Sequence, residues 1–171
     1  MKKILLYKVV LISSIACLAM TPFSQPSKKV VKQVQAAFDL DAIAFIPMLI
    51  EGEPSNNLTE DSYYSLKVND SLIGYAVVDK APSKTAFFDY LVVTDKDLSI
   101  VRSRVITYRE EYGGAIGSYR WLKQFIGKKP DSDFTDIAAI SGATISVQSM
   151  KKAIIESLET LHKLKSQQLI P

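Results

Sequence analysis

The stretch YYSLKVNDSLIGYAVVDK, residues 63–80, decides which fold this chain adopts. Its first half alternates in the manner of a strand with one buried face. Asn69, Asp70 and Ser71 then predict a short turn, because their side chains tolerate the backbone conformations that tight turns require. The apolar run from Leu72 to Lys80 is the partner strand. The stretch therefore predicts an antiparallel hairpin.

A second pair of strands follows at once. TAFFDYLVVTD (85–95) and LSIVRSRVITYRE (98–110) lie on either side of a turn at Asp95, Lys96 and Asp97. Short turns join antiparallel neighbours, whereas parallel strands need long crossover connections. We therefore expect an α+β fold built on an antiparallel sheet of about four or five strands.

Apolar residues spaced three and four positions apart predict three helices around this sheet. In chain order, their apolar faces are Val30, Val31, Val34 and Phe38; Tyr119, Leu122, Phe125 and Ile126; and, in a long C-terminal helix from about Ser146, Val147, Met150, Ile154, Leu158, Leu161 and Leu164. The short middle helix follows a flexible turn at Gly113, Gly114 and Gly117, and it ends at Gly127 and Pro130.

The stretch ISGATIS, residues 140–146, comes directly before the C-terminal helix. A helix start exposes unpaired N–H groups with a partial positive charge, which suits a phosphate. Gly142 can adopt backbone conformations closed to other residues, and Ala143 leaves room for a ligand. Ser141 and Thr144 also belong to the residue types that cap helices. Two interpretations stay open here: a phosphate site, or a helix cap alone.

The order of these elements resembles the FMN-binding domain family. That family includes covalently flavinylated components of the sodium-translocating NADH:quinone reductase and of the Rnf complex. The matching features are GYAVV, the hairpin, the glycine-rich turn, FIGK and Ser-Gly-Ala-Thr, over roughly residues 60–165. The resemblance implies FMN as cofactor, esterified through its phosphate to Thr144 by a separate, magnesium-dependent flavin transferase that uses FAD. It also implies that Ser141, Gly142 and Ala143 shape the transferase's recognition site.

One position departs from the pattern of this family, which has an acidic residue three positions before the Ser or Thr. Ala138 occupies that place, and the nearest acid, Asp136, comes two residues earlier. The glycine-rich turn also differs from the family's Glu-Thr-Pro-Gly pattern, so no catalytic residue is assigned from it. The alternative function is an exported, non-catalytic accessory or binding domain in which the stretch Ser141–Thr144 only caps a helix.

The N-terminus reads MKKILLYKVVLISSIACLAM, residues 1–20. A basic start followed by the uncharged run from Val9 to Met20 is typical of a secretory signal peptide. As a helix this run spans about 18 Å, short of the roughly 30 Å hydrocarbon core. Cys17, the only cysteine, leaves lipidation as another form of anchoring. We expect three segments: a signal peptide or membrane anchor (1–24), a helix and linker (25–59) and the FMN-binding domain (60–171).

The charge distribution restricts the partners. All six basic residues before residue 33 lie in the export segment and its flank, which leaves 15 lysines and arginines against 18 acidic residues. No basic face for nucleic acid is evident in this composition, and the only histidine, His162, predicts no metal site. We expect an extracytoplasmic electron carrier or redox subunit, periplasmic or membrane-anchored, rather than a stand-alone enzyme. Its partners are the flavin transferase and a membrane-associated redox protein.

Overall fold

The computed structural model describes residues 25–48 and 63–171. Five strands form one antiparallel sheet in the order β1-β2-β3-β4-β5, which confirms the predicted α+β fold. The strands are β1 (Ala44–Pro47), β2 (Tyr63–Val68), β3 (Ser71–Pro82), β4 (Phe87–Asp95) and β5 (Ile100–Thr107). β1 lies within the segment predicted as helix and linker. It is an edge strand of four residues, too short to show a period, and its proline is tolerated because one side is unpaired.

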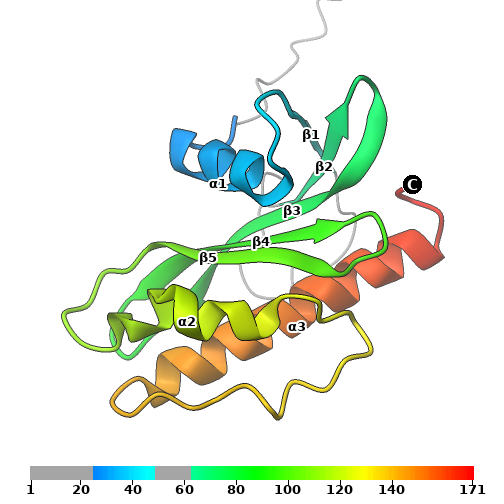
Figure 1. Cartoon of the computed structure of the whole chain (residues 1–171). Coiled ribbons are helices and arrows are strands. Elements are labelled where there is room, and N and C mark those ends of the chain that lie inside the picture. Colours follow the sequence, from blue (N-terminus) through cyan, green and yellow to red (C-terminus); the bar gives the residue numbers. More distant parts are fainter. Residues whose placement is uncertain (1–24, 49–62) are drawn as a thin grey trace, which may run out of the picture.

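Helices cover both faces of the sheet (Figure 1). α1 (Lys28–Phe38) lies on one face, and α2 (Tyr119–Leu122) and α3 (Thr144–Ser166) lie on the other. α1 begins directly after Ser27, whose hydroxyl caps the helix by accepting a hydrogen bond from the Val30 N–H at 3.4 Å. α3 begins two residues before the expected start at Ser146.

The apolar face predicted for the short helix is partly wrong. Tyr119 and Ile126 are 63% and 47% exposed, whereas Trp121, Leu122 and Phe125 are buried. α2 is a single α-helical turn, flanked by the 3₁₀ turns η1 (Gly114–Gly117) and η2 (Lys123–Phe125). A 3₁₀ turn has three residues per turn instead of 3.6, so the helical period used for the prediction does not hold there.

The inner strands β3 and β4 are buried on both faces of the sheet. Tyr75, Val77 and Val92 belong to the core cluster under α3, whereas Leu91 and Val93 belong to the cluster under α1. Neighbouring residues of a strand point to opposite faces, so this alternation fixes the register against both helix layers. α3 contributes most of its apolar face to the first cluster, including Val147, Met150, Ile154, Leu158 and Leu161.

Both predicted turns form. Asn69 and Asp70 have φ of 48° and 63°, the left-handed pair that joins antiparallel strands with the correct twist. At the second turn, one carboxylate oxygen of Asp95 accepts hydrogen bonds from the N–H groups of Asp97 and Ser99, each at 2.9 Å.

The segment predicted to be a signal peptide or anchor, residues 1–24, lies outside the described residues. Among those that are described, no helix is both long and apolar enough to cross a membrane.

Candidate functional site

The start of α3 lacks a side-chain cap. Ala143 is the N-cap residue, and its carbonyl accepts the first helical hydrogen bond from Val147 N–H at 2.9 Å. Within the described residues, no side chain bonds to the N–H groups of the first turn as a cap. The interpretation that Ser141 or Thr144 caps this helix is therefore wrong. Thr144 is the first helical residue, and it is exposed.

The residues just before Thr144 shape this helix start. Gly142 has φ of +78°, a conformation that side-chain-bearing residues rarely adopt, and no described atom lies within 4 Å of the place where its Cβ would stand. Ser141 and Gly142 are exposed, whereas Ala143 is buried in the core under α3. Open space therefore adjoins the helix start at Gly142, while Ala143 fixes the chain to the core.

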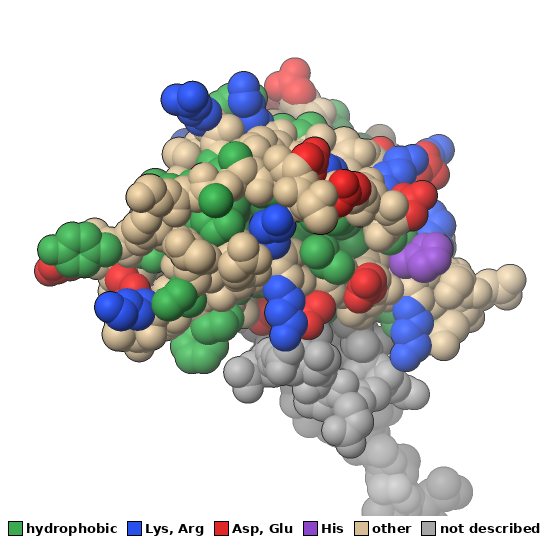
Figure 2. Space-filling view, turned by 90° about the horizontal axis from the view of Figure 1, so that it is seen from below, with side chains coloured by type: hydrophobic (Ala, Val, Ile, Leu, Met, Phe, Trp, Pro, Cys, Tyr) green, Lys and Arg blue, Asp and Glu red, His purple; other side chains and the backbone are tan. Residues whose placement is uncertain are grey.

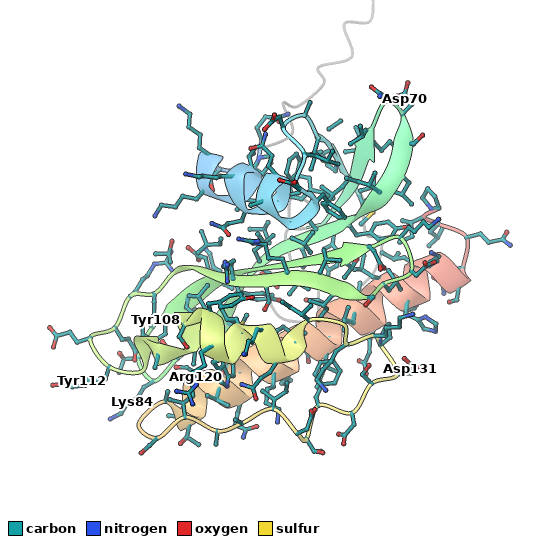
Figure 3. All side chains as sticks on the ribbon, in the orientation of Figure 1. Asp70, Lys84, Tyr108, Tyr112, Arg120 and Asp131 are labelled. Carbon is teal, nitrogen blue, oxygen red and sulfur yellow. The ribbon has the colours of Figure 1, made fainter. Side chains whose placement is uncertain are left out.

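The glycine-rich loop lies against the first turn of α3. The Tyr108 hydroxyl is 3.0 Å from the Ser146 hydroxyl and donates to the Tyr112 carbonyl at 2.9 Å. A Cβ on Gly113 would stand 2.5 Å from that Tyr108 oxygen. Figure 3 shows Tyr108 and Tyr112 at the same end of the molecule as the start of α3. Two motifs that are far apart in the sequence therefore meet at one place.

Arg109 and Glu110, which follow Tyr108 in the chain, connect the glycine-rich loop to the sheet. Arg109 forms an ion pair with Asp89 of β4 at 2.5 Å. One carboxylate oxygen of Glu110 accepts hydrogen bonds from the Ser83 hydroxyl at 2.7 Å and from the Thr85 N–H at 2.6 Å, in the turn between β3 and β4. These hydrogen bonds lower the pKa of Glu110 to about 2, and the bond from Ser83 has the largest effect. The loop is thus tied to both α3 and the sheet.

The segment that leads to Ser141 is held by α2 and η2. The Trp121 ring N–H donates to the Ala138 carbonyl at 2.7 Å. The side-chain amide oxygen of Gln124 accepts a hydrogen bond from the Ala138 N–H at 3.0 Å. The Gln124 amide also donates to the Trp121 carbonyl at 3.1 Å. Both backbone groups of Ala138 are therefore satisfied by side chains, while its own methyl group faces solvent.

Asp136 does not take the place of the acid that Ala138 lacks. Its carboxylate pairs with the Lys128 ammonium at 2.8 and 3.0 Å. The same ammonium donates to the Asp133 carbonyl. Asp136 thus stabilises the loop between η2 and α3, and its carboxylate is already engaged.

The residues at this end fit the phosphate of FMN and offer apolar contacts beside it. The N–H groups of the uncapped first turn and the exposed Thr144 hydroxyl are suited to a phosphate. Large apolar side chains are exposed nearby, among them Tyr112 at 81% and Ile145 at 51%, and Figure 2 shows hydrophobic side chains projecting at this end of the molecule. The donor set thus offers both polar and apolar contacts.

Sequence reasoning missed the residues that hold this site together. It predicts Tyr108, Arg109 and Glu110 only as the end of a strand, and Trp121 and Gln124 only as parts of a helix. Each acts on residues 14 to 38 positions away in the chain. No local pattern encodes such contacts, so only the fold reveals them.

The close approach at Gly113 leads to a test with a matched control. Gly113→Ala is expected to lower the free energy of unfolding by about 1–2 kcal/mol or more, because alanine is strained at positive φ and its methyl group displaces Tyr108. Gly114→Ala is the control, since φ is negative there and the nearest atom would be 3.6 Å away. Its effect should stay within about 0.5 kcal/mol. Urea denaturation of both variants measures the difference; equal effects would contradict the tight packing at Gly113.

Comparison with known proteins agrees with this geometry. The FMN-binding domain family matches residues 87–159, from the start of β4 through the glycine-rich loop and Thr144 to the later turns of α3. No curated protein matches the chain. The cofactor that this match indicates is FMN, so the chain is an FMN-binding flavoprotein. The similarity to the FMN-binding domain family covers residues 87–159 of the chain.

Proposed function

We propose that this chain is an exported electron-transfer protein whose FMN is attached to Thr144 by a phosphoester. One observation carries the proposal: an exposed threonine hydroxyl stands at the uncapped start of a 23-residue helix, inside the matched domain. A hydroxyl needed only for capping would bond to the helix start, and this one does not. It is therefore free to react.

Attachment is a transfer of the FMN moiety from FAD. The Thr144 oxygen forms a bond to the FMN-side phosphorus, and the phosphoanhydride of FAD breaks. AMP leaves, and the hydroxyl proton passes to solvent. No electrons are exchanged in this step. The transferase supplies the magnesium and the catalysis, and this chain supplies the nucleophile.

The residues of the chain hold the attachment point and stabilise its charge. The positive end of the α3 dipole favours the phosphate by about 0.3–1 kcal/mol per favourable contact. Val147 and Met150, both buried, fix the first turns of α3 to the sheet. The position of Thr144 is thereby set by the core, whereas its side chain stays accessible.

Bound FMN supplies the acceptance and donation of electrons, and the chain supplies position and polarity. A covalent link is useful outside the cytoplasm, where no flavin pool refills an empty site. A cofactor held only by equilibrium binding is lost as its free concentration falls. The electron partner in this proposal is a membrane-associated redox protein.

The alternative, an exported accessory domain, depends on Ala138 and on a Ser-Gly-Ala-Thr stretch that serves as a cap. The lack of a capping bond among the described residues at the start of α3 speaks against the second part. Ala138 affects only the covalent link, because FMN can bind at the helix start without a bond to Thr144. The flavin carrier is therefore the better supported function.

Replacement of the threonine tests the attachment site. After co-expression with a flavin transferase, Thr144→Ala should lose the whole mass increment of one FMN group that the wild type carries. The exposed threonine makes no capping bond, so the free energy of unfolding should change by less than about 0.5 kcal/mol. Thr135→Ala, which removes another exposed threonine hydroxyl, is the control and should keep the increment. Intact-mass spectrometry gives both results, and flavin still attached to Thr144→Ala would rule this site out.

Restoration of the acid tests the role of position 138. Ala138→Asp should raise the flavinylated fraction, because the side chain there is exposed and the backbone is held independently by Trp121 and Gln124. The same mass measurement reports the fraction. An unchanged fraction would mean that the carboxylate does not limit attachment.

Export can be tested separately from flavin. Residues 1–35, fused to an alkaline phosphatase that is active only outside the cytoplasm, should give an active enzyme. The physical reason is the basic start and apolar run of the first twenty residues. A fusion in which Lys2 and Lys3 are kept but the apolar run is deleted is the control. An inactive full fusion would count against export.

A further inference from the structure

A cavity of about 670 Å³ runs along one side of α3, between this helix and the ends of β3 and β4. It begins beside Ser149, about 7.5 Å of helix rise beyond Thr144, a span that a ribityl phosphate arm can cover. Phe87 also lines it, next to Phe88, whose ring lies 5.9 Å from that of Tyr108. The cavity therefore lies farther along α3 than the helix start described above, and Ser149 is its lining residue nearest to Thr144 in the chain.

Asp79 is the unusual residue of this cavity. Strand alternation places it on the α3 side of β3, together with Val77 and Ala81 of the core, and it pairs across the sheet with Tyr90. Within the described part of the chain, no lysine or arginine forms a salt bridge with it. Burial raises the pKa of its carboxyl to about 6, and a hydrogen bond from the Lys80 N–H only partly offsets this. A carboxylate on an inner face costs stability unless a donor reaches it.

The neighbouring hydroxyl groups do not supply that donor. The Ser157 hydroxyl donates to the Ala153 carbonyl at 2.7 Å and lies 3.1 Å from the Tyr90 oxygen. The Thr160 hydroxyl donates to the Glu156 carbonyl at 2.8 Å. These groups bond to the helix and to each other. The cavity thus presents an acceptor at Asp79, a loosely paired ammonium at Lys152, which is 3.7 Å from Glu156, and an exposed apolar ring at Phe87.

From this arrangement we infer that the cavity holds the isoalloxazine ring of FMN, with Asp79 accepting the hydrogen bond of the ring N3–H. The pyrimidine edge of a flavin carries one N–H between two carbonyl groups, which suits a cavity that holds a carboxylate acceptor together with donors such as Lys152 and Ser149. The opposite, dimethylbenzene end is apolar and suits Phe87 and Pro82. The inference rests on the proposed function, because it takes FMN to be tethered or bound at the start of α3.

The test compares free FMN with N3-methyl-FMN, which lacks the N3–H donor. Titration calorimetry of the full, flavin-free chain should show that the wild type prefers FMN by about tenfold, the usual contribution of a hydrogen bond to a charged group. Asp79→Ala removes the acceptor, so it should bind FMN more weakly and lose most of this preference. Asp97→Ala, at an exposed position of the β4–β5 turn, is the control and should keep it.

Each outcome separates this inference from the proposed function. If the wild type binds both flavins equally, or if Asp79→Ala keeps the full preference, the ring lies elsewhere while FMN binding stands. If the wild type binds neither flavin and gains no FMN mass with the transferase, the proposed function fails as well. The comparison on the wild type needs no variant, so it decides the inference even if Asp79→Ala does not fold.

Discussion

The structure depends on one constraint: β3 and β4 are buried on both faces, under α1 on one side and α3 on the other. A slip of one residue would turn the apolar set of one layer toward the other, so the register is strongly specified. The same alternation that buries Val77 and Ala81 under α3 also places Asp79 there. The register therefore directs Asp79 toward α3, although the residue is only partly buried and lines the cavity.

α3 links this core to the site. Its apolar face buries Val147 and Met150 in the first turns, so the helix start cannot shift relative to the sheet. The glycine-rich loop is held against the same elements: Tyr108 contacts Ser146 of α3, and Glu110 accepts a hydrogen bond from Thr85 in the β3–β4 turn. A binding site made of loops needs such anchors, because loops have few buried contacts of their own. Here hydrogen bonds supply the rigidity that packing gives elsewhere.

The sequence predicts what short-range patterns encode. Alternation and turn residues predict the four strands after residue 60, and the apolar period of three and four predicts α1 and α3. Where the local period changes, as in the 3₁₀ turns on either side of α2, the prediction for Tyr119 and Ile126 is wrong. The sequence also cannot predict that the start of α3 is uncapped, because Ser and Thr suit a helix cap as well as a ligand site. Which role they take depends on the dihedral angles at Gly142 and Ala143, and these follow from the packing of the whole loop.

Position 138 distinguishes two properties: the FMN binding that the family match indicates, and the covalent attachment that we propose. The fold uses only the backbone of Ala138, which Trp121 and Gln124 hold by its carbonyl and its N–H. The side chain points to solvent, so its identity changes what the surface offers to another protein and not how the loop is built. The helix dipole, the open space at Gly142 and the exposed hydroxyl of Thr144 are all intact without a carboxylate. Binding of FMN therefore depends on the architecture of this chain, whereas the efficiency of the covalent attachment that we propose would depend on how well a transferase recognises the loop that carries Ala138.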